Sequence, residues 1–256
     1  TALANSGANG RGAAWGDLDG DGDLDVVVAN YGSDNLLLRN DGNDAFAPVT
    51  GTPFNTDIVN AVCPILFDFD NDGDLDIFVH AIGPSGTARL YRNEGSFVFA
   101  DATASEAPSF LTDYADGRGA AVADIDGDGD LDVFRANGSA TVGGGISYLY
   151  LNNTNNKNWL KVKVVGTASD PQAYGARVYV FESGTRNLRG YSQVQSQSGY
   201  ESFNSLVQHF GLPSEGRYDV EVLFPRSGKI ARRGSVSPAQ TLTITELNGD
   251  GHWIFY

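Results

Sequence analysis

Three stretches of this sequence carry an aspartate at every second residue: residues 17–25, 68–76 and 124–132. All three read D-x-D-x-D-G-D-L-D, and each leads directly into an apolar run. Carboxylate oxygens at this spacing, with glycine where the backbone must turn sharply, suit a hard cation that takes about six to eight oxygen ligands. Without a cation, five aspartates within nine residues would repel one another strongly. The pattern therefore predicts about three Ca²⁺ ions, one in each loop.

The positions within each loop can be assigned separate roles. We expect side-chain ligation from the first, third, fifth and ninth positions and a carbonyl ligand from the seventh, with glycine at the sixth for the tight turn. An EF-hand begins in the same way but needs glutamate at its twelfth position, which is Val28, Val79 or Arg135 here, so we reject that interpretation. The predicted metal ligands are Asp17, Asp19, Asp21, Asp23 and Asp25; Asp68, Asp70, Asp72, Asp74 and Asp76; and Asp124, Asp126, Asp128, Asp130 and Asp132.

The loops belong to a longer internal repeat. Their first residues are 51 and 56 positions apart, and the tetrapeptide R-G-A-A precedes the first and third loops at residues 11–14 and 118–121. After each loop come a short apolar strand and a second strand with a polar turn, and a short aromatic strand closes at least the first two units. Each unit has the content of one four-stranded propeller blade. We predict three calcium-binding repeats over residues 1–156.

From residue 157 the composition changes, because aspartate becomes scarce and the expected strands become longer. Residues 160–165, 176–181, 220–224 and 242–245 are apolar or alternate between apolar and polar. No segment shows a helical period, so the fold class is all-β, with propeller-like blades followed by a C-terminal β-sandwich-like domain over residues 157–256.

The charge is divided between these two parts. Residues 1–150 hold 24 acidic and 6 basic side chains, and residues 151–256 hold 8 and 11, giving −18 and +3 within a total of −15. Such an acidic chain is a poor partner for nucleic acid, whereas its two ends can attract each other within or between molecules. No apolar run approaches the roughly 20 residues that cross a bilayer, so we expect no membrane insertion.

Two absences bear on localisation. The sequence has no methionine, which favours a chain matured by N-terminal cleavage and therefore an extracellular or cell-surface protein. Its single cysteine, Cys63, excludes a disulfide framework, so bound metal would have to brace an exported fold.

These residues carry a family resemblance. The three loops resemble FG-GAP/VCBS repeats, the calcium-bearing blades of the integrin α-subunit propeller. The second part resembles the ASPIC/UnbV domain, which follows such repeats in the family of cartilage acidic protein and its bacterial relatives. The matching segments are N-W-L-K-V, G-A-R-V, S-G-Y, H-F-G-L and V-E-V at residues 158–162, 175–178, 198–200, 209–212 and 220–222.

The resemblance leaves one question about architecture. Propellers of this kind have about seven blades, and three cannot close a ring with ordinary blade geometry. Residues 151–256 could complete the arrangement, a neighbouring molecule could do so, or the chain could be part of a longer product. A broken fourth loop at residues 246–254 reads as a plain turn, and the apolar residues 253–256 should be docked, on this chain or on another.

The sequence gives little support for catalysis. His80, His209 and His252 lie in no zinc-ligand spacing, and neither a G-x-S-x-G motif nor a P-loop is present. We interpret His209 as a structural histidine and Cys63 as buried and unreactive. The aromatic residues of the strand runs are expected in the core: Trp15, Phe67, Tyr91, Phe134 and Tyr148.

We therefore predict a non-catalytic extracellular calcium-binding protein with an adhesive or structural role, in which self-association into a filament is possible through strand or head-to-tail contacts. The alternative is a monomeric adhesion module that binds a glycan or another extracellular protein. A carbohydrate-active enzyme is the remote alternative.

Overall fold

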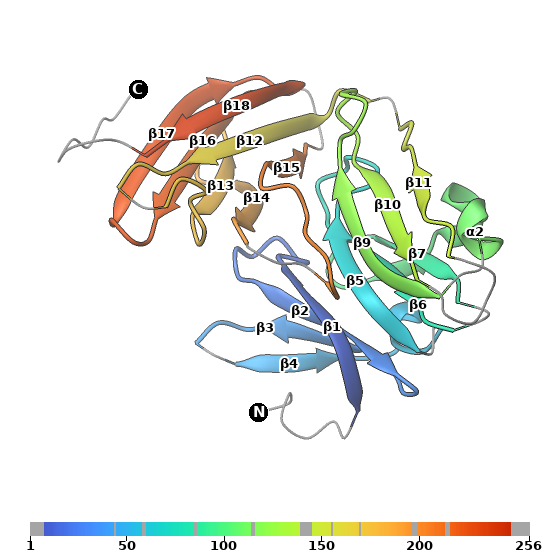
Figure 1. The fold of residues 1–256 in the computed structure, drawn as a ribbon. Helices are drawn as coiled ribbons and strands as arrows, with labels where there is room; N and C mark the ends of the chain where they lie inside the picture. Colours follow the sequence, from blue (N-terminus) through green and yellow to red (C-terminus); the bar gives the residue numbers. More distant parts are fainter. Residues whose placement is uncertain are drawn as a thin grey trace.

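The computed structural model describes residues 8–246, except for 44, 58–59, 84–85, 114–115, 139–144, 155, 169, 196–198 and 213–215. In this part of the chain the fold is nearly all β (Figure 1). The helices there are single turns: α1 (Pro53–Thr56), α2 (Thr103–Glu106) and the 3-10 helix η2 (Pro108–Leu111). No helix among the described residues is long and apolar enough to cross a membrane.

The three repeats form three antiparallel meanders in sequence order. The first two have the order β1-β2-β3-β4 and β5-β6-β7-β8, and the third has three strands in the order β11-β10-β9. The first sheet contains β1 (Asn9–Gly16), β2 (Asp25–Tyr31), β3 (Leu36–Asn40) and β4 (Phe46–Val49). The second contains β5 (Ala61–Phe67), β6 (Asp76–Ala81), β7 (Ala88–Asn93) and β8 (Phe99–Asp101), and the third β9 (Gly117–Ala123), β10 (Asp132–Asn137) and β11 (Tyr148–Tyr150).

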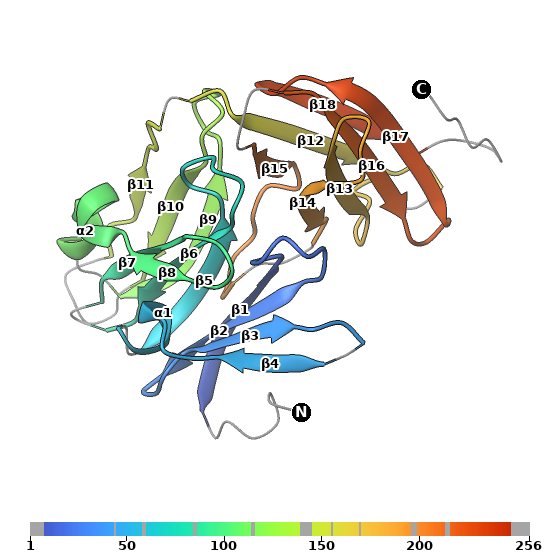
Figure 2. The same cartoon turned by 180° about the vertical axis from the view of Figure 1, so that it is seen from behind.

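Neighbouring repeat sheets pack face to face, as blades of a propeller do (Figure 2). One apolar cluster joins the first and second sheets, with Val27 and Ile77 among its members, and another joins the second and third through Phe78 and Val133. Because the second sheet lies between the other two, every residue of β6 is buried. Among the described residues, the three repeat sheets form an arc and not a closed ring (Figure 2).

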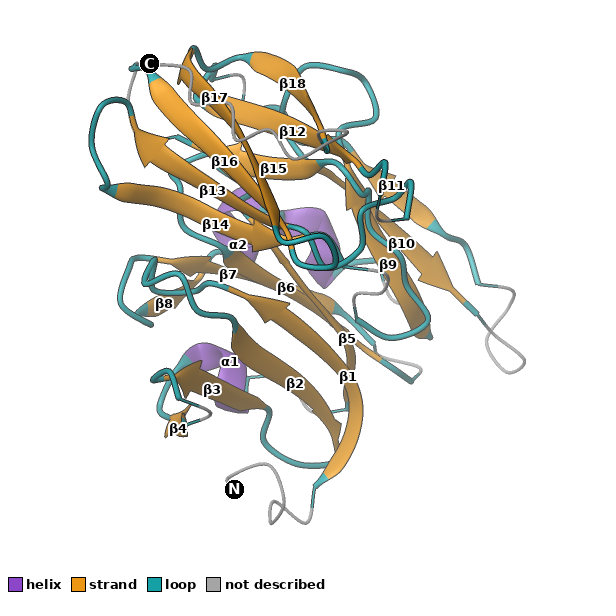
Figure 3. Ribbon diagram, turned by 90° about the vertical axis from the view of Figure 1, so that its left-hand side faces the viewer, coloured by secondary structure: helices purple, strands orange, loops and turns teal. Residues whose placement is uncertain are grey.

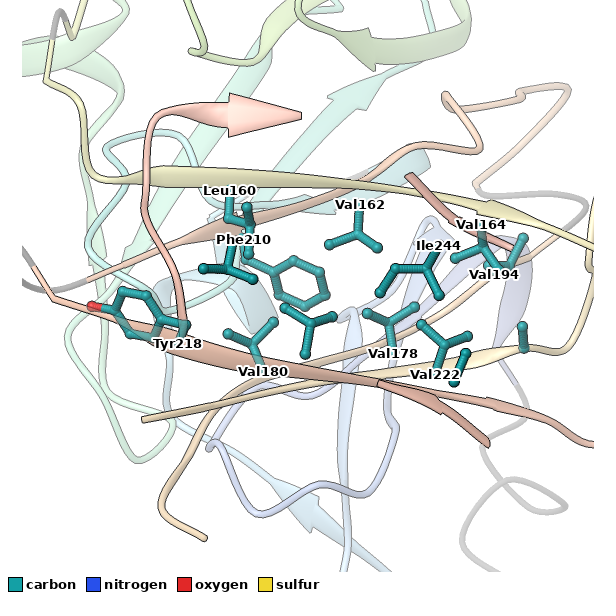
Figure 4. Packing of buried hydrophobic residues seen from close by; sticks show 14 of the residues in the cluster. Leu160, Val162, Val164, Val178, Val180, Val194, Phe210, Tyr218, Val222 and Ile244 are labelled. Carbon is teal, nitrogen blue, oxygen red and sulfur yellow. The ribbon is translucent and has the colours of Figure 1, made fainter. Parts of the chain in front are cut away.

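The C-terminal part forms two further sheets packed on each other (Figure 3). One has the order β15-β12-β18 and includes a parallel pair, β12 with β18; the other has the order β14-β13-β16-β17. Alternate residues of β12, such as Leu160 and Val162, point into an apolar core shared with Val178 and Val222 of the second sheet (Figure 4). The strands are β12 (Trp159–Val165), β13 (Arg177–Glu182), β14 (Leu188–Gln193), β15 (Gln208–Gly211), β16 (Tyr218–Phe224), β17 (Lys229–Val236) and β18 (Gln240–Thr245).

A segment of the C-terminal part returns to the repeats. Residues 199–204, between β14 and β15, run along the first strand of every repeat (Figure 1). The Gly199 N–H donates to the carbonyl of Ala13 in β1 (3.2 Å), and the Ser202 hydroxyl accepts from the Ala120 N–H in β9 (2.9 Å). We call residues 199–204 the axial segment. Through the axial segment, the C-terminal part contacts all three repeat sheets of the open arc.

The glycines of the repeated R-G-A-A motif lie where the chain packs closely against other segments. A Cβ on Gly119 would lie 2.7 Å from the Glu201 carbonyl oxygen of the axial segment. A Cβ on Gly12 would lie 2.3 Å from the Val62 carbonyl oxygen of the second repeat and 3.2 Å from the Tyr200 Cβ. Glycine at these positions lets two backbones approach closely. In the second repeat the thiol of Cys63 takes the equivalent place, 3.3 Å from the Ser202 hydroxyl.

The expected core was partly wrong. Phe67 and Tyr91 are buried, but the side chains of Trp15 and Phe134 are 45% and 43% exposed, and Tyr148 is half-buried. Trp15 lies on the first sheet and Phe134 on the third. The second sheet has a neighbouring repeat sheet on both faces, whereas the first and third each have one on a single face. The predicted turn and apolar tail at residues 247–256 lie outside the described residues, although Glu246 is buried and accepts the Thr167 N–H at 2.8 Å.

Candidate metal centres

Each aspartate loop lies between the first and second strands of its repeat, so the strand pairing fixes both of its ends. Gly22, Gly73 and Gly129 at the sixth position have φ values of 92°, 101° and 107°, in the left-handed region that favours glycine. The fourth position also has positive φ, and in the second loop Asn71 (φ 60°) takes it, which asparagine tolerates better than most residues.

In each loop, three of the five aspartates converge. Carboxylate oxygens of the first, third and ninth positions lie within 4.8 Å of one another in all three loops. These triads are Asp17, Asp19 and Asp25; Asp68, Asp70 and Asp76; and Asp124, Asp126 and Asp132. Three carboxylates pointing at one volume are the donor set that a hard cation such as Ca²⁺ requires.

Backbone hydrogen bonds hold the first and ninth positions in place. Asp17 accepts the N–H groups of Gly20 (2.8 Å) and Gly22 (3.0 Å), which draws the loop around its carboxylate. Asp25 accepts the N–H groups of Leu18 and Asn40, both at 2.8 Å. Asp76 and Asp132 accept the corresponding pairs in the second and third loops.

The fifth and seventh positions are arranged differently from the triads. The carboxylate of Asp21 accepts the N–H of Asp23 at 2.9 Å, and Asp72 and Asp128 make the equivalent bonds to Asp74 and Asp130. The carboxylates that converge in each loop do not include the side chains of the fifth and seventh positions.

In the first two loops, several carboxylates are buried with too few hydrogen bonds to offset the loss of water. Buried oxygens of Asp19 and Asp70 have no hydrogen-bond partner. Burial raises the pKa of Asp17 and Asp70 to about 6, and that of Asp25 to about 7, with smaller contributions from neighbouring aspartates. Burial, followed by the charge of Asp72, raises the pKa of Asp68 to about 8. A carboxylate that is hard to ionise in the ion-free fold is one that a bound cation would stabilise. The residues of these loops therefore fit calcium.

A repeated pattern of asparagine contacts links the first loop to the second repeat and the second loop to the third repeat, and sequence reasoning missed it. The Asn93 side-chain amide donates to the carbonyls of Leu75 (3.1 Å) in its own repeat and Leu18 (2.9 Å) in the first loop. Asn152 does the same for Leu131 (3.4 Å) and Phe69 (2.6 Å). The signal was available, because asparagine ends the third strand of the first two repeats and follows it in the third.

The C-terminal sheets cover the second and third loops. A Cβ on Gly211 of β15 would overlap the carboxylate of Asp68, and one on Gly129 would overlap the indole of Trp159. His209 lies 2.9 Å through its Nε2 from the Gly129 carbonyl oxygen. Lys161 of β12 forms an ion pair with Asp124. All three loops thus lie at junctions between structural units.

The histidines and the cysteine that sequence analysis considered for chemistry lie in surroundings that favour a structural role. Burial lowers the pKa of His80 and His209 to about 4, so both imidazoles are neutral near pH 7, and His80 lies 3.0 Å from the Arg118 carbonyl oxygen. Burial raises the pKa of the Cys63 thiol, which disfavours the reactive thiolate. His252 lies outside the described residues.

Comparison with known families agrees with this architecture. Residues 17–79 and 68–135 match the FG-GAP-like repeat family, and residues 166–251 match the ASPIC and UnbV family. The chain therefore carries FG-GAP-like repeats followed by an ASPIC and UnbV domain.

Individual relatives match this chain across both its repeats and its C-terminal part. The chain is 32% identical to Cartilage acidic protein 1 of Homo sapiens over 251 residues, which cover 93% of this chain and 36% of that protein. Cartilage acidic protein 1 of Mus musculus and of Xenopus tropicalis are also 32% identical, each over 93% of this chain and 37% of the relative. The chain thus spans little more than a third of the length of these relatives.

Proposed function

We propose that this protein is a non-catalytic, extracellular calcium-binding protein in which calcium stiffens a β scaffold with an adhesive or structural role. One observation carries the proposal: three aspartate triads recur at the junctions between repeats and C-terminal sheets. A cation held there would neutralise each loop and fix the units that meet at it.

The ligand assignment follows from the triads. The first, third and ninth positions of each loop would supply carboxylate oxygens, and the predicted carbonyl of the seventh position and side chain of the fifth would complete the shell. At the fifth position one carboxylate oxygen accepts the N–H of the seventh residue. This leaves it able to ligate, because a carboxylate oxygen has more than one lone pair, and both oxygens of Asp17 and of Asp25 also accept N–H groups.

The division into two domains, residues 1–156 and 157–256, is part of the proposal. The repeat sheets end with β11 at Tyr150, and the C-terminal sheets begin with β12 at Trp159. The axial segment and the loop contacts would make the two domains one mechanical unit.

An extracellular location is supported by the calcium sites themselves. Extracellular modules can use weak calcium sites, because the ion is abundant there, and a fold braced by metal does not need disulfides. The likeness to Cartilage acidic protein 1 agrees with such a role.

Counting bound ions tests the proposal. We expect about three Ca²⁺ per chain by native mass spectrometry, and two in the Asp25→Ala variant, which removes a buried triad member of the first loop. The fifth-position variant Asp21→Ala should keep three ions with weaker binding to the first loop. Retention in Asp25→Ala of three ions, each bound as tightly as in the parent protein, would contradict the assignment, and no calcium at all in the parent would refute the proposal.

A second candidate, self-assembly, is favoured by apolar residues exposed on the two end sheets. Trp15 and Tyr31 are exposed on the first sheet, and Phe134 and Leu149, which pair across β10 and β11, are exposed on the third. Light scattering with and without EGTA separates the candidates. Large particles that dissolve on calcium removal would support a calcium-dependent filament, whereas a particle near 27.2 kDa would support a monomeric binding module.

A further inference from the structure

The third loop differs from the other two in having a lysine of the C-terminal sheet beside its carboxylates. Lys161 of β12 forms an ion pair with Asp124, the first-position aspartate of the triad that also contains Asp126 and Asp132. The Lys161 ammonium also lies 4.5 Å from the centre of the Trp159 ring. This ring packs against Gly129 at the sixth position of the loop.

The position of Lys161 is enclosed. Its side chain is 15% exposed and that of Asp124 is 4% exposed, so this ion pair is more sheltered from water than the exposed pairs of the other loops. Asp124 also accepts the N–H groups of Gly127 (2.7 Å) and Gly129 (3.0 Å). An ammonium held against this carboxylate takes one of its oxygens and adds a positive charge at the place where a divalent cation would bind.

The arginines near the first two loops are engaged elsewhere. Arg39 forms an ion pair with Asp41, and Arg92 forms one with Glu94. Arg189 of β14 lines a pocket with Asp17 and Asp68 but pairs with Glu182. All three arginine side chains are more than one third exposed, at 45%, 36% and 41%. They therefore act on the loops through solvent, unlike Lys161.

We propose that Lys161 sets the cation affinity of the third loop, making it the weakest of the three sites, and that a cation bound there competes with the contact between Lys161 and Asp124. The inference rests on the proposed function of the loops as calcium sites. Because coupling is reciprocal, a contact that weakens cation binding is itself weakened by the cation. The third loop would then connect calcium concentration to the seating of β12 on the repeats, while the first two loops stay filled.

Terbium luminescence can report on the third loop selectively. Terbium replaces calcium in oxygen sites and emits when a nearby indole is excited, and Trp159 lies against the third loop. Excitation at a wavelength that indole absorbs and tyrosine does not keeps Tyr191, which lines a pocket with Asp17 and Asp68, from contributing. The full chain with Trp15→Phe and Trp253→Phe keeps Trp159 as its single tryptophan. In this background we expect Lys161→Met to lower the terbium concentration at half-maximal emission about tenfold, because one positive charge leaves the site.

Two variants serve as controls. Lys163→Met removes the same charge from the same strand at an exposed position, and its midpoint should stay unchanged. Lys161→Arg keeps the charge, so its midpoint should remain near that of the parent.

The outcomes separate the two proposals. No sensitised emission in any variant, together with no bound calcium by mass spectrometry, would refute the loops as cation sites. Emission that calcium displaces, with the same midpoint in Lys161→Met as in the parent, would overturn the role of Lys161 and leave the sites in place. A higher midpoint in Lys161→Met would overturn it as well.

A second measurement needs no variant. If a cation displaces Lys161 from Asp124, acetylation of Lys161 by a water-soluble reagent should increase with calcium relative to Lys163 in the same molecule. A several-fold increase in that ratio, read by peptide mass spectrometry, supports the competition. An unchanged or lower ratio contradicts it.

Discussion

The second and third aspartate loops share one sequence pattern but lie in different electrostatic surroundings. In the second loop, Asp68 is 3% exposed and is covered by the backbone of Gly211. Burial and then Asp72 raise its pKa to about 8. In the third loop, burial also acts to raise the pKa of Asp124, but the ion pair with Lys161 and two backbone N–H groups outweigh it, and the pKa lies below its usual value.

This difference shows that the set of aspartates alone does not determine how readily the carboxylates of a loop ionise. Both loops place the same three carboxylates together and take the same backbone turn. What differs is the strand of the C-terminal sheets that lies on top: β15 brings a glycine to one loop, and β12 brings a lysine to the other. The predictions below test this contrast, from the largest expected effect to the smallest.

The strongest test concerns the packing of Trp159 on the third loop. A Cβ at Gly129 would overlap the indole and must also adopt φ 107°, so Gly129→Ala should lower the free energy of unfolding by about 3 kcal/mol or more. Gly127→Ala in the same loop also needs positive φ (84°) but meets no atom within 4 Å, and should cost about 1 kcal/mol. Urea unfolding of both variants measures the difference. Equal costs would show that β12 is not seated on this loop.

Replacing the first-position aspartate by asparagine should have unequal effects in the second and third loops, in EGTA at pH 8. Asp124→Asn leaves Lys161 largely enclosed without its partner and should cost about 1–2 kcal/mol. Asp68→Asn removes a carboxylate whose ionisation burial already opposes, so its cost should be about 1 kcal/mol smaller or absent. Denaturant unfolding measures both costs. Equal costs for the two variants, or a larger cost for Asp68→Asn, would contradict the contrast between the loops.

Asn152 physically connects the two loops, since its amide donates to Phe69 in the second and to Leu131 in the third. Asn152→Ala should lower stability by about 1–2 kcal/mol, because two carbonyls lose their donor. Asn40→Ala is the matched control: its amide donates to Leu24 within its own repeat (3.2 Å), and its loss should cost about 0.5–1 kcal/mol. Thermal unfolding in calcium compares them, and an equal cost would argue against a link between repeats.

The smallest expected effect is a pH dependence of the ion-free protein. Between the ordinary pKa of aspartate near 3.8 and the value of about 8 for Asp68, the folded chain binds more protons than the unfolded chain. Stability in EGTA should therefore decrease as pH rises from 5 to 8, by about 1 kcal/mol. Asp124, whose pKa is lowered, contributes in the opposite direction, and its contribution is lost only at acidic pH.

Calcium should remove this decrease, because a bound cation favours the ionised carboxylates. Unfolding curves at pH 5 and 8, with EGTA and with calcium, give the four values needed. Asp68→Asn should reduce the decrease in EGTA, and Asp124→Asn should not. Stability that increases from pH 5 to 8 in EGTA would contradict the account of the second loop.

Sequence reasoning predicted the local parts of this molecule well. The alternation of β12, the apolar runs of β2 and β6 and the loops between paired strands all follow from patterns a few residues long. The repeated glycine of each loop predicted a tight turn, and the structure shows positive φ there. The ligand roles of the aspartates stay a prediction, with the first, third and ninth positions brought together and the fifth and seventh arranged apart.

The core prediction for Trp15 and Phe134 was wrong for a reason that sequence patterns do not contain. A strand in a meander has two faces, and whether the outer face is buried depends on the sheet beside it. The second sheet has a neighbour on both sides, so β6 is wholly buried, whereas the first and third sheets lie at the ends of the arc.

The sequence by itself determined the aspartate loops, the strands that hold them and the order of repeats before C-terminal sheets, because each depends on residues adjacent in the chain. Only the tertiary structure decided that residues 199–204 lie along the three repeats, that Gly211 covers Asp68 and that Lys161 reaches Asp124. Lys161 and Asp124 are 37 residues apart. Local patterns give a strand its faces, but the packing of whole sheets decides which loop a given face meets. Here that packing gives loops of one sequence pattern different charged neighbours.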